Sequence, residues 1–132
     1  MVILKINFEA DSPIYEQIIT QIKKQVARGE LEPGSKLPSQ RAMARKLEVN
    51  PNTVQRAYRE METRELVETK RGRGTFIHHS QQVVERVKQE LVTTALDKFW
   101  QEMQSLDYSQ AEIVEAVKDY AQQSSDDNGG VN

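Results

Sequence analysis

The chain has no cysteine among its 132 residues. This absence excludes disulfide bonds, thiolate zinc sites, iron–sulfur clusters and cysteine nucleophiles together. No apolar run approaches the roughly 20 residues that span a bilayer, and the segment 1–9 is too short and too mixed for a secretory signal. We therefore expect a cytoplasmic protein that does not bind a membrane.

The sequence also lacks the residue arrangements that carry chemistry in enzymes. It has only two histidines, and no catalytic triad, pair of catalytic carboxylates or spaced set of metal ligands is evident. A single domain of roughly 100 to 150 residues also leaves little room for a large enclosed substrate cavity. We therefore expect neither an enzyme nor a bound cofactor.

The net charge of −2 conceals two unlike parts of the chain. Residues 1–79 carry 14 Lys and Arg against 10 Asp and Glu, a net charge of +4. Residues 80–132 carry 4 Lys and Arg against 10 Asp and Glu, a net charge of −6. A basic front part can meet a polyanion such as nucleic acid, whereas an acidic rear part should avoid one. The two parts are therefore expected to have different roles.

Near the N-terminus, alternating apolar residues predict a short strand over residues 1–8, and a helix follows it. Ser12 and Pro13 resemble an N-cap followed by proline at the first helical position. Apolar residues then recur every three or four positions to about Ala27, and Gly29 provides the stop. One face of this helix is predicted to be buried.

Two further helices are predicted close together after residue 38. Ser39 is a natural cap for a short second helix, and Asn50-Pro51 opens a third helix about three residues after the second ends. This spacing is typical of a helix-turn-helix. The third helix has one apolar stripe, and the opposite half of its helical wheel carries the long polar side chains of Asn52, Gln55, Arg56 and Arg59.

A basic hairpin is predicted after the third helix. Residues 66–69 and 75–77 have the composition of two short strands, and Lys70-Arg-Gly-Arg-Gly74 has the composition of the turn that joins them. A helix-turn-helix followed by such a hairpin predicts a winged helix over residues 1–78.

The polar face of the third helix has the residue types that bind DNA bases. Arginine pairs with guanine edges in the major groove, asparagine or glutamine pairs with adenine edges, and threonine contacts phosphate or the thymine methyl. A merely solvated face is the alternative, but basic residues on the second helix and the wing flank this face, where phosphates would lie. The arginines of the wing tip suit the minor groove. The predicted DNA-binding residues are Ser39, Arg41, Arg45, Asn52, Thr53, Gln55, Arg56, Arg59, Lys70, Arg71, Gly72 and Arg73.

Residues 79–123 predict a helical hairpin that joins two protomers. A long helix runs from Gln81 to about Leu106, and Ser109 with Glu112 forms a capping box for the last helix. Residues 124–132 are almost without apolar side chains and are predicted to be disordered. The aromatic residues of the long helix can line a ligand pocket, but they more often anchor interfaces. The predicted dimer contacts are Val84, Val87, Leu91, Phe99, Trp100 and Met103.

Two other features offer weaker candidates for chemistry. His78 and His79 would point to opposite faces if both lie in a strand, so we expect no shared metal site. The Gly-x-Gly of residues 72–74 lies in a hairpin and does not open a helix, so it lacks the geometry of a nucleotide-phosphate loop.

Several spaced motifs resemble the winged-helix domain of GntR-family bacterial transcriptional regulators. The resemblance covers roughly residues 7–78, and the opening Ser12-Pro-Ile-Tyr-Glu-Gln17 and the short tail are similar to the YtrA-type branch. The chain departs from many relatives at Pro51 and Gln55, where they have arginine, and at Glu65, where they have glycine. The matching motifs occur in the family's order, as Leu37-Pro-Ser-Gln-Arg41, Met43-Ala44, Leu47, Val49-Asn-Pro-Asn-Thr-Val54, Arg56-Ala57, Leu66-Val67 and Gly72-Arg-Gly-Thr-Phe76.

This resemblance implies a dimeric repressor that places its helix-turn-helix in the major groove of a palindromic operator and its wing in the minor groove. It implies backbone or base contacts for Arg41, base contacts for Asn52 to Arg56 and a minor-groove contact for Gly72, while the departures imply a different operator. The YtrA-type branch also implies control of a transporter operon. Other branches bind a small-molecule effector in a larger C-terminal domain.

About 50 residues remain after the winged helix, which is too few for an enclosed pocket of even roughly 300 Å³. An effector site is therefore either small and shared between protomers, or regulation works otherwise. Two other functions stay open, a protein-interaction module and a fragment of a cofactor-dependent enzyme; the basic wing argues against the first and the lack of catalytic residues against the second.

The predicted fold is mostly α with a small β wing. An N-terminal winged helix-turn-helix binds double-stranded DNA, and a C-terminal two-helix hairpin makes a homodimer.

Overall fold

The computed structural model describes residues 6, 8 and 11–127 of the chain. The chain divides into two compact units, and the boundary between Leu91 and Val92 falls inside the helix α4 (Gln82–Ser105). The sequence predicts a boundary at residue 78, which assigns the whole of the long helix to the tail. The strand predicted over residues 1–8 lies almost entirely outside the described residues.

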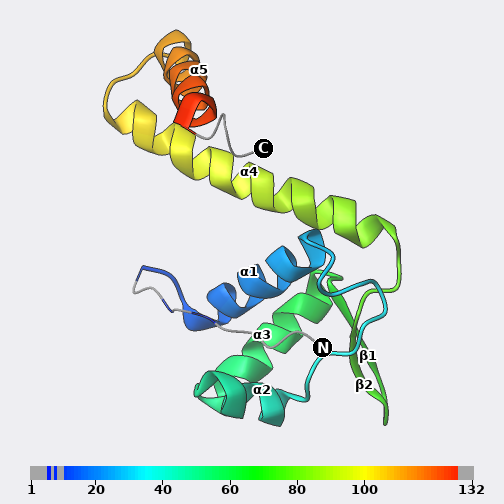
Figure 1. Cartoon of the computed structure of the whole chain (residues 1–132). Coiled ribbons are helices and arrows are strands. Elements are labelled where there is room, and N and C mark those ends of the chain that lie inside the picture. Colours follow the sequence, from blue (N-terminus) through cyan, green and yellow to red (C-terminus); the bar gives the residue numbers. More distant parts are fainter. Residues whose placement is uncertain (1–5, 7, 9–10, 128–132) are drawn as a thin grey trace. The chain divides into compact units, whose positions relative to one another are not determined.

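Three helices form the body of the first unit (Figure 1). They are α1 (Ile14–Ala27), α2 (Gln40–Leu47) and α3 (Pro51–Thr63). The short turn between α2 and α3 gives the predicted helix-turn-helix. All three begin within a residue or two of the predicted starts, which is the usual uncertainty at helix ends.

The predicted caps of α2 and α3 are present. Ser39 Oγ accepts a hydrogen bond from the Ala42 amide at 3.1 Å, and Asn50 Oδ1 accepts one from the Asn52 amide at 2.8 Å. Pro51 occupies the first turn of α3, where its missing N–H costs nothing. These local bonds fix where both helices begin.

The start of α1 differs from the prediction. Pro13 is the N-cap residue, and no side chain caps the first turn. The Ser12 hydroxyl instead donates to the Pro13 carbonyl at 3.5 Å, and the helix begins at Ile14. Gly29 adopts a φ of 79° just after the helix, as the predicted stop requires.

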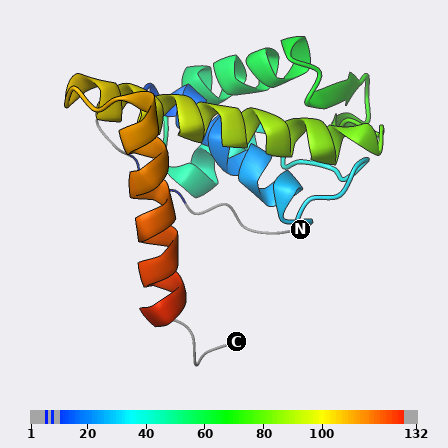
Figure 2. The same cartoon turned by 90° about the horizontal axis from the view of Figure 1, so that it is seen from above.

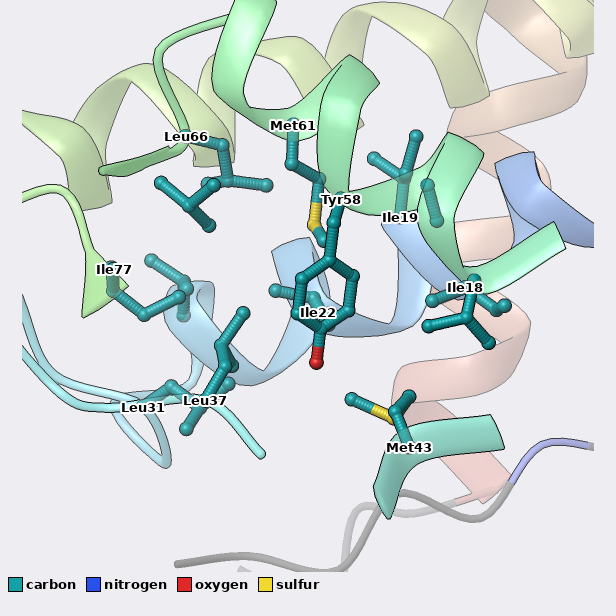
Figure 3. Packing of buried hydrophobic residues seen from close by; sticks show 14 of the residues in the cluster. Ile18, Ile19, Ile22, Leu31, Leu37, Met43, Tyr58, Met61, Leu66 and Ile77 are labelled. Atoms are coloured by element: carbon teal, nitrogen blue, oxygen red, sulfur yellow. The ribbon is translucent and has the colours of Figure 1, made fainter. Parts of the chain in front are cut away.

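The core of the first unit forms where the apolar faces of the three helices meet the hairpin (Figure 3). Ile18 and Ile22 on α1 have no exposed surface, and neither do Val54 and Met61 on α3. Tyr58 is 3% exposed, and its hydroxyl donates to the Pro38 carbonyl at 2.6 Å. This bond joins α3 to the segment that leads into α2.

Two turns of the first unit use a left-handed backbone without glycine. Glu48, after α2, has a φ of 55°, and Glu65, after α3, has a φ of 59°. The Leu66 amide then donates to the Met61 carbonyl at 2.8 Å and closes the end of α3. The chain therefore ends α3 in the conformation that glycine favours, at the cost of strain at Glu65.

The wing consists of β1 (Val67–Lys70) and β2 (Gly74–Ile77), which pair antiparallel with Lys70 opposite Gly74. A third short stretch, residues 35–37, lies along β2 and was not predicted. The Leu37 amide donates to the Thr75 carbonyl at 2.8 Å, and Lys36 forms a bridge with Phe76. The loop before α2 is therefore part of the wing.

The two histidines do not point to opposite faces, because they do not lie in a strand, which was the condition of that prediction. β2 ends at Ile77, and the chain bends at His79. The His78 and His79 rings are stacked, with centroids 4.9 Å apart and planes at 16°. The alternation of a strand does not apply after the strand has ended.

In the second unit, α4 continues from the first unit as one uninterrupted helix (Figure 2), and α5 (Gln110–Asp127) follows it. The predicted capping box is present, because the Ser109 amide donates to Glu112 Oε1 at 2.9 Å and the Glu112 amide donates to Ser109 Oγ at 3.2 Å. The predicted disorder begins at residue 124, whereas α5 continues to Asp127; residues 128–132 lie outside the described part. Among the described helices, none combines the length and apolar composition needed to cross a bilayer.

Candidate nucleic-acid interface

The outer face of α3 presents polar side chains because its inner face is completely buried. Val54, Ala57 and Met61 have no exposed surface, so the helix cannot rotate without losing its core. The side chains on the opposite face, predicted to contact DNA, are all exposed; they are Asn52, Gln55, Arg56 and Arg59. Thr53 lies at the margin and is half-buried.

A hollow of about 420 Å³ lies between α2, α3 and β1. Gln55 and Arg59 line it together, so these two predicted DNA-binding residues open onto one surface. The hollow is an open surface feature of mixed polarity, in keeping with a contact to a macromolecule. The full lining is Gln40, Gln55, Tyr58, Arg59, Glu62, Thr63 and Thr69.

Arg56 is turned toward α1. Its guanidinium lies 4.0 Å from the centre of the Tyr15 ring, and its Nη2 donates to the Tyr15 hydroxyl at 3.3 Å. A cation over an aromatic ring at an exposed site is stabilised by about 0.5–1 kcal/mol. Sequence reasoning grouped Arg56 with the other outward residues and missed Tyr15, whose position at the edge of the apolar face of α1 was the available indication.

Ser39 has a structural role that is compatible with a phosphate contact. Its Oγ accepts the capping hydrogen bond from the Ala42 amide, and its hydroxyl proton can still be donated to a phosphate. Arg41 and Arg45 project from the same helix, and both are exposed.

The wing turn carries its charges at the surface. Arg71, Gly72 and Arg73 are exposed, Gly72 has a φ of 76°, and the Arg73 amide donates to the Lys70 carbonyl at 2.8 Å. The Lys70 ammonium lies 5.0 Å from the centre of the Phe76 ring.

Lys36 belongs to the same basic surface, although sequence reasoning did not select it. Its ammonium lies 6.0 Å from the centre of the Phe76 ring. The pairing of residues 35–37 with β2 brings it there, and no local pattern around residue 36 indicated that pairing.

Most of the predicted phosphate-binding charges have no acidic partner. Arg64 pairs with Glu16 at 2.6 Å, and Arg28 pairs with Glu30 at 2.8 Å. By contrast, within residues 11–127 no ion pair is formed by Arg41, Arg45, Arg59, Lys70, Arg71 or Arg73. Their positive charges therefore stay available to an external anion.

Comparison with known proteins identifies the family. A family model described as "Bacterial regulatory proteins, gntR family" matches residues 14–77. The chain is 44% identical over 116 residues to a Bacillus subtilis protein named "Uncharacterized HTH-type transcriptional regulator YhcF", an alignment that covers 88% of this chain and 96% of that protein. The chain belongs to the GntR family.

Two further comparisons agree with this assignment. The chain is 49% identical over 74 residues to the "HTH-type transcriptional repressor YtrA" of Bacillus subtilis, covering 56% of this chain and 57% of that one. The structure also matches a GntR family transcriptional regulator from Listeria monocytogenes with a TM-score of 0.74 and 37% identity, over 85% of this chain and 98% of the other. The predicted winged helix-turn-helix with C-terminal helices is confirmed.

The protein is thus a DNA-binding transcriptional regulator of the GntR family. The relatives described above are named as transcriptional regulators, in agreement with the prediction that the chain is no enzyme. The resemblance to the YtrA-type branch is supported in part, since YtrA and YhcF are both among the relatives.

The structure explains two of the departures from the common GntR pattern. Pro51 starts α3 and has no side-chain donor, so this position cannot supply the base contact that an arginine would. Glu65 holds the left-handed conformation after α3, which shows why many GntR relatives have glycine there.

Three of the predicted dimer contacts belong largely to the winged-helix core. Val87 has no exposed surface and packs in this core, and its contact with a partner stays a prediction. Val84 and Leu91 are half-buried and pack against the same core. Sequence reasoning saw one continuous apolar stripe along α4, whereas the first turns of this helix complete the first unit.

The other predicted dimer contacts lie in the second unit. Phe99 is 36% exposed, and Trp100 and Met103 are half-buried. Further large apolar side chains of this unit are also exposed, including Leu96 at 57% and Leu106 at 65%.

Proposed function

We propose that this GntR regulator is a cytoplasmic homodimeric repressor that binds a palindromic operator. The observation that carries the proposal is the outer face of α3, where Asn52 and Gln55 are exposed between unpaired basic residues of α2 and the wing. Side chains of these types discriminate bases in the major groove, and flanking cations bind phosphates. The similarity to a protein named as the repressor YtrA supports repression.

In this proposal the residues have three roles. Asn52, Thr53 and Gln55 contact base edges, and Arg59 contacts bases or phosphate beside Gln55. Arg56 reaches DNA only if its guanidinium leaves the Tyr15 ring. We therefore assign it a smaller contribution to DNA binding than the sequence suggested. The phosphate and minor-groove contacts fall to Ser39, Arg41, Arg45, Lys70, Arg71, Gly72 and Arg73.

The first test is selection of bound sequences from a random duplex library at near-physiological salt, followed by titration of the selected duplex against scrambled DNA. We expect a palindrome with half-sites about one helical turn apart and a specificity ratio of roughly 10³ or more. Weak, salt-sensitive binding without enrichment would contradict sequence-specific regulation. The position of the selected palindrome in the genome then tests the expectation of a transporter operon.

Two variants separate base contacts from phosphate contacts. Gln55→Ala should cost about 1–3 kcal/mol on the selected duplex and relax specificity at one base pair, with little effect on scrambled DNA. Arg41→Ala should weaken binding to both duplexes and reduce the salt slope by about one. Gln89→Ala and Lys88→Ala, on an exposed face of α4, are the matched controls. Equal losses on both duplexes for Gln55→Ala would refute its assignment to base recognition.

The homodimer is proposed from the exposed apolar side chains of the second unit. A charge placed among them should be costly in an apolar contact, so Phe99→Asp should shift the chain toward monomer in sedimentation and weaken operator binding. Gln101→Asp adds the same charge at an exposed position of the same helix and should leave the dimer intact. A dimer unchanged by Phe99→Asp would contradict the assigned interface.

An effector site shared between protomers stays a prediction.

A further inference from the structure

Three side chains of types that can ligate metals meet at the open end of the wing. Glu68 lies in β1, and His78 and His79 directly follow β2. Glu68 Oε1 is 2.9 Å from His79 Nδ1 and 3.5 Å from His78 Nε2. One ligand atom from each of the three residues lies within 4.8 Å of the other two.

The backbone explains why these residues meet. The His78 amide donates to the Leu66 carbonyl at 2.9 Å, which extends the pairing of the strands by one residue. His78 and Glu68 are therefore on one side of the hairpin, as diagonal neighbours across the two strands. The bend at His79 then turns the second imidazole onto the same side, where it stacks on the first.

We propose that Glu68, His78 and His79 form a binding site for a divalent transition-metal ion of the zinc type. Two imidazoles and one carboxylate are a donor set that zinc accepts, with solvent at the fourth position. In tetrahedral coordination at about 2.1 Å, the ligand atoms stand roughly 3.4 Å apart. The side chains must therefore close by up to about 1.4 Å, which is within reach because the His79 side chain is 72% exposed.

Coordination changes one hydrogen bond of His78. In the structure the Ser80 amide donates to His78 Nδ1 at 3.2 Å, which places the ring proton on Nε2. A metal bound through Nε2 requires that proton to move to Nδ1, so the bond from Ser80 is lost. The loss of one such bond is small beside the binding energy of two imidazoles and a carboxylate, and it supplies a spectroscopic readout at Ser80.

The composition of the chain makes the site easy to test. The chain has two histidines and no cysteine, so both of its imidazoles belong to this cluster. Carboxylates elsewhere suit magnesium or calcium better than zinc. The cluster lies at the end of the hairpin opposite to the turn at residues 71–73, so the proposal does not depend on DNA binding.

The test is a titration of zinc into the full-length chain, prepared without a histidine tag, in competition with a chromogenic chelator. We expect one saturable site per chain that excess magnesium does not displace. Glu68→Gln and His79→Gln should each weaken zinc binding by about tenfold or more, since even the loss of an outer-shell partner can cost that much. Glu85→Gln, at an exposed carboxylate of α4 outside the cluster, should leave binding unchanged.

Nuclear magnetic resonance gives an independent readout. Zinc should shift the side-chain nitrogens of both histidines and the amide of Ser80 in the parent chain. At the same zinc concentration, chosen to half-saturate the parent chain, the shift of the Ser80 amide should be several-fold smaller in Glu68→Gln. The far-ultraviolet spectrum of each variant confirms that it is folded. No saturable zinc binding, or binding that the substitutions at positions 68 and 79 leave as strong as that of Glu85→Gln, would overturn the proposal.

Discussion

Removing one oxygen atom from Tyr58 should destabilise the winged helix measurably. The Tyr58 ring is 3% exposed, and its hydroxyl donates to the Pro38 carbonyl at 2.6 Å. Tyr58→Phe keeps the packing of the ring but leaves that half-buried carbonyl without its partner. An unpaired buried acceptor costs about 1–3 kcal/mol, and the partial exposure of Pro38 places the expected loss near the lower end, at about 1–2 kcal/mol.

Urea unfolding at neutral pH, followed by circular dichroism, measures this loss. Tyr120→Phe is the matched control, because the Tyr120 side chain is 74% exposed and removal of its hydroxyl should change the free energy of unfolding by less than about 0.5 kcal/mol. If Tyr58→Phe were no less stable than Tyr120→Phe, the hydrogen bond would not hold α3 to the segment before α2 as argued here.

The parent chain and Tyr58→Phe should also differ in how their stability depends on pH. Burial raises the pKa of the Tyr58 hydroxyl above its ordinary value of 10.0. The unfolded chain therefore releases this proton at a lower pH than the folded chain does, and ionisation favours unfolding. The stability advantage of the parent chain over Tyr58→Phe should be complete below pH 10 and should shrink as the pH rises above it. A difference that stays constant through alkaline pH would contradict burial of the hydroxyl.

Two further predictions concern turns and ion pairs of the first unit. Glu65→Gly should raise the free energy of unfolding by about 0.5–1 kcal/mol, because it relieves the left-handed strain at φ 59° at a smaller cost in chain entropy. Glu65→Ala keeps the strain and should not stabilise, so equal gains in urea for both variants would count against this explanation. The hydrogen bond from Arg64, with its charge, lowers the pKa of Glu16 below 4.5. The stabilisation by this pair, about 0.5 kcal/mol at its partly exposed site, is therefore present above pH 4.5 and lost as the pH falls through the lowered pKa. Unfolding of the parent chain and of Glu16→Gln across this range should show that their difference in free energy of unfolding vanishes at low pH. A difference that stays constant would exclude the ion pair as its cause.

Much of the fold could be predicted because its decisive interactions are local. The caps at Ser39 and Asn50 involve amides two or three residues away, and the capping box at Ser109 spans three positions. The apolar stripe of α3 follows from helical periodicity alone. For the same reason the exposed polar face opposite that stripe could be predicted from the sequence.

The structure differs from the sequence-based expectations where tertiary packing or element ends decide the outcome. Periodicity showed that Val87 faces something apolar but not whether that partner was the winged-helix core or a second protomer. The alternation rule was applied to His79 although the strand had already ended at Ile77. Composition alone suggested disorder from residue 124, where α5 in fact continues to Asp127.

The sequence by itself therefore determined the order of helices and strands, the face of α3 that stays outside and the family. Only the tertiary structure placed Tyr15 under Arg56, 41 positions away, Lys36 beside the wing and Glu68 against both histidines. These contacts join residues that are distant along the chain. Helical and strand periodicity extends only over neighbouring residues, so pairs of this kind are set by how the elements pack against one another.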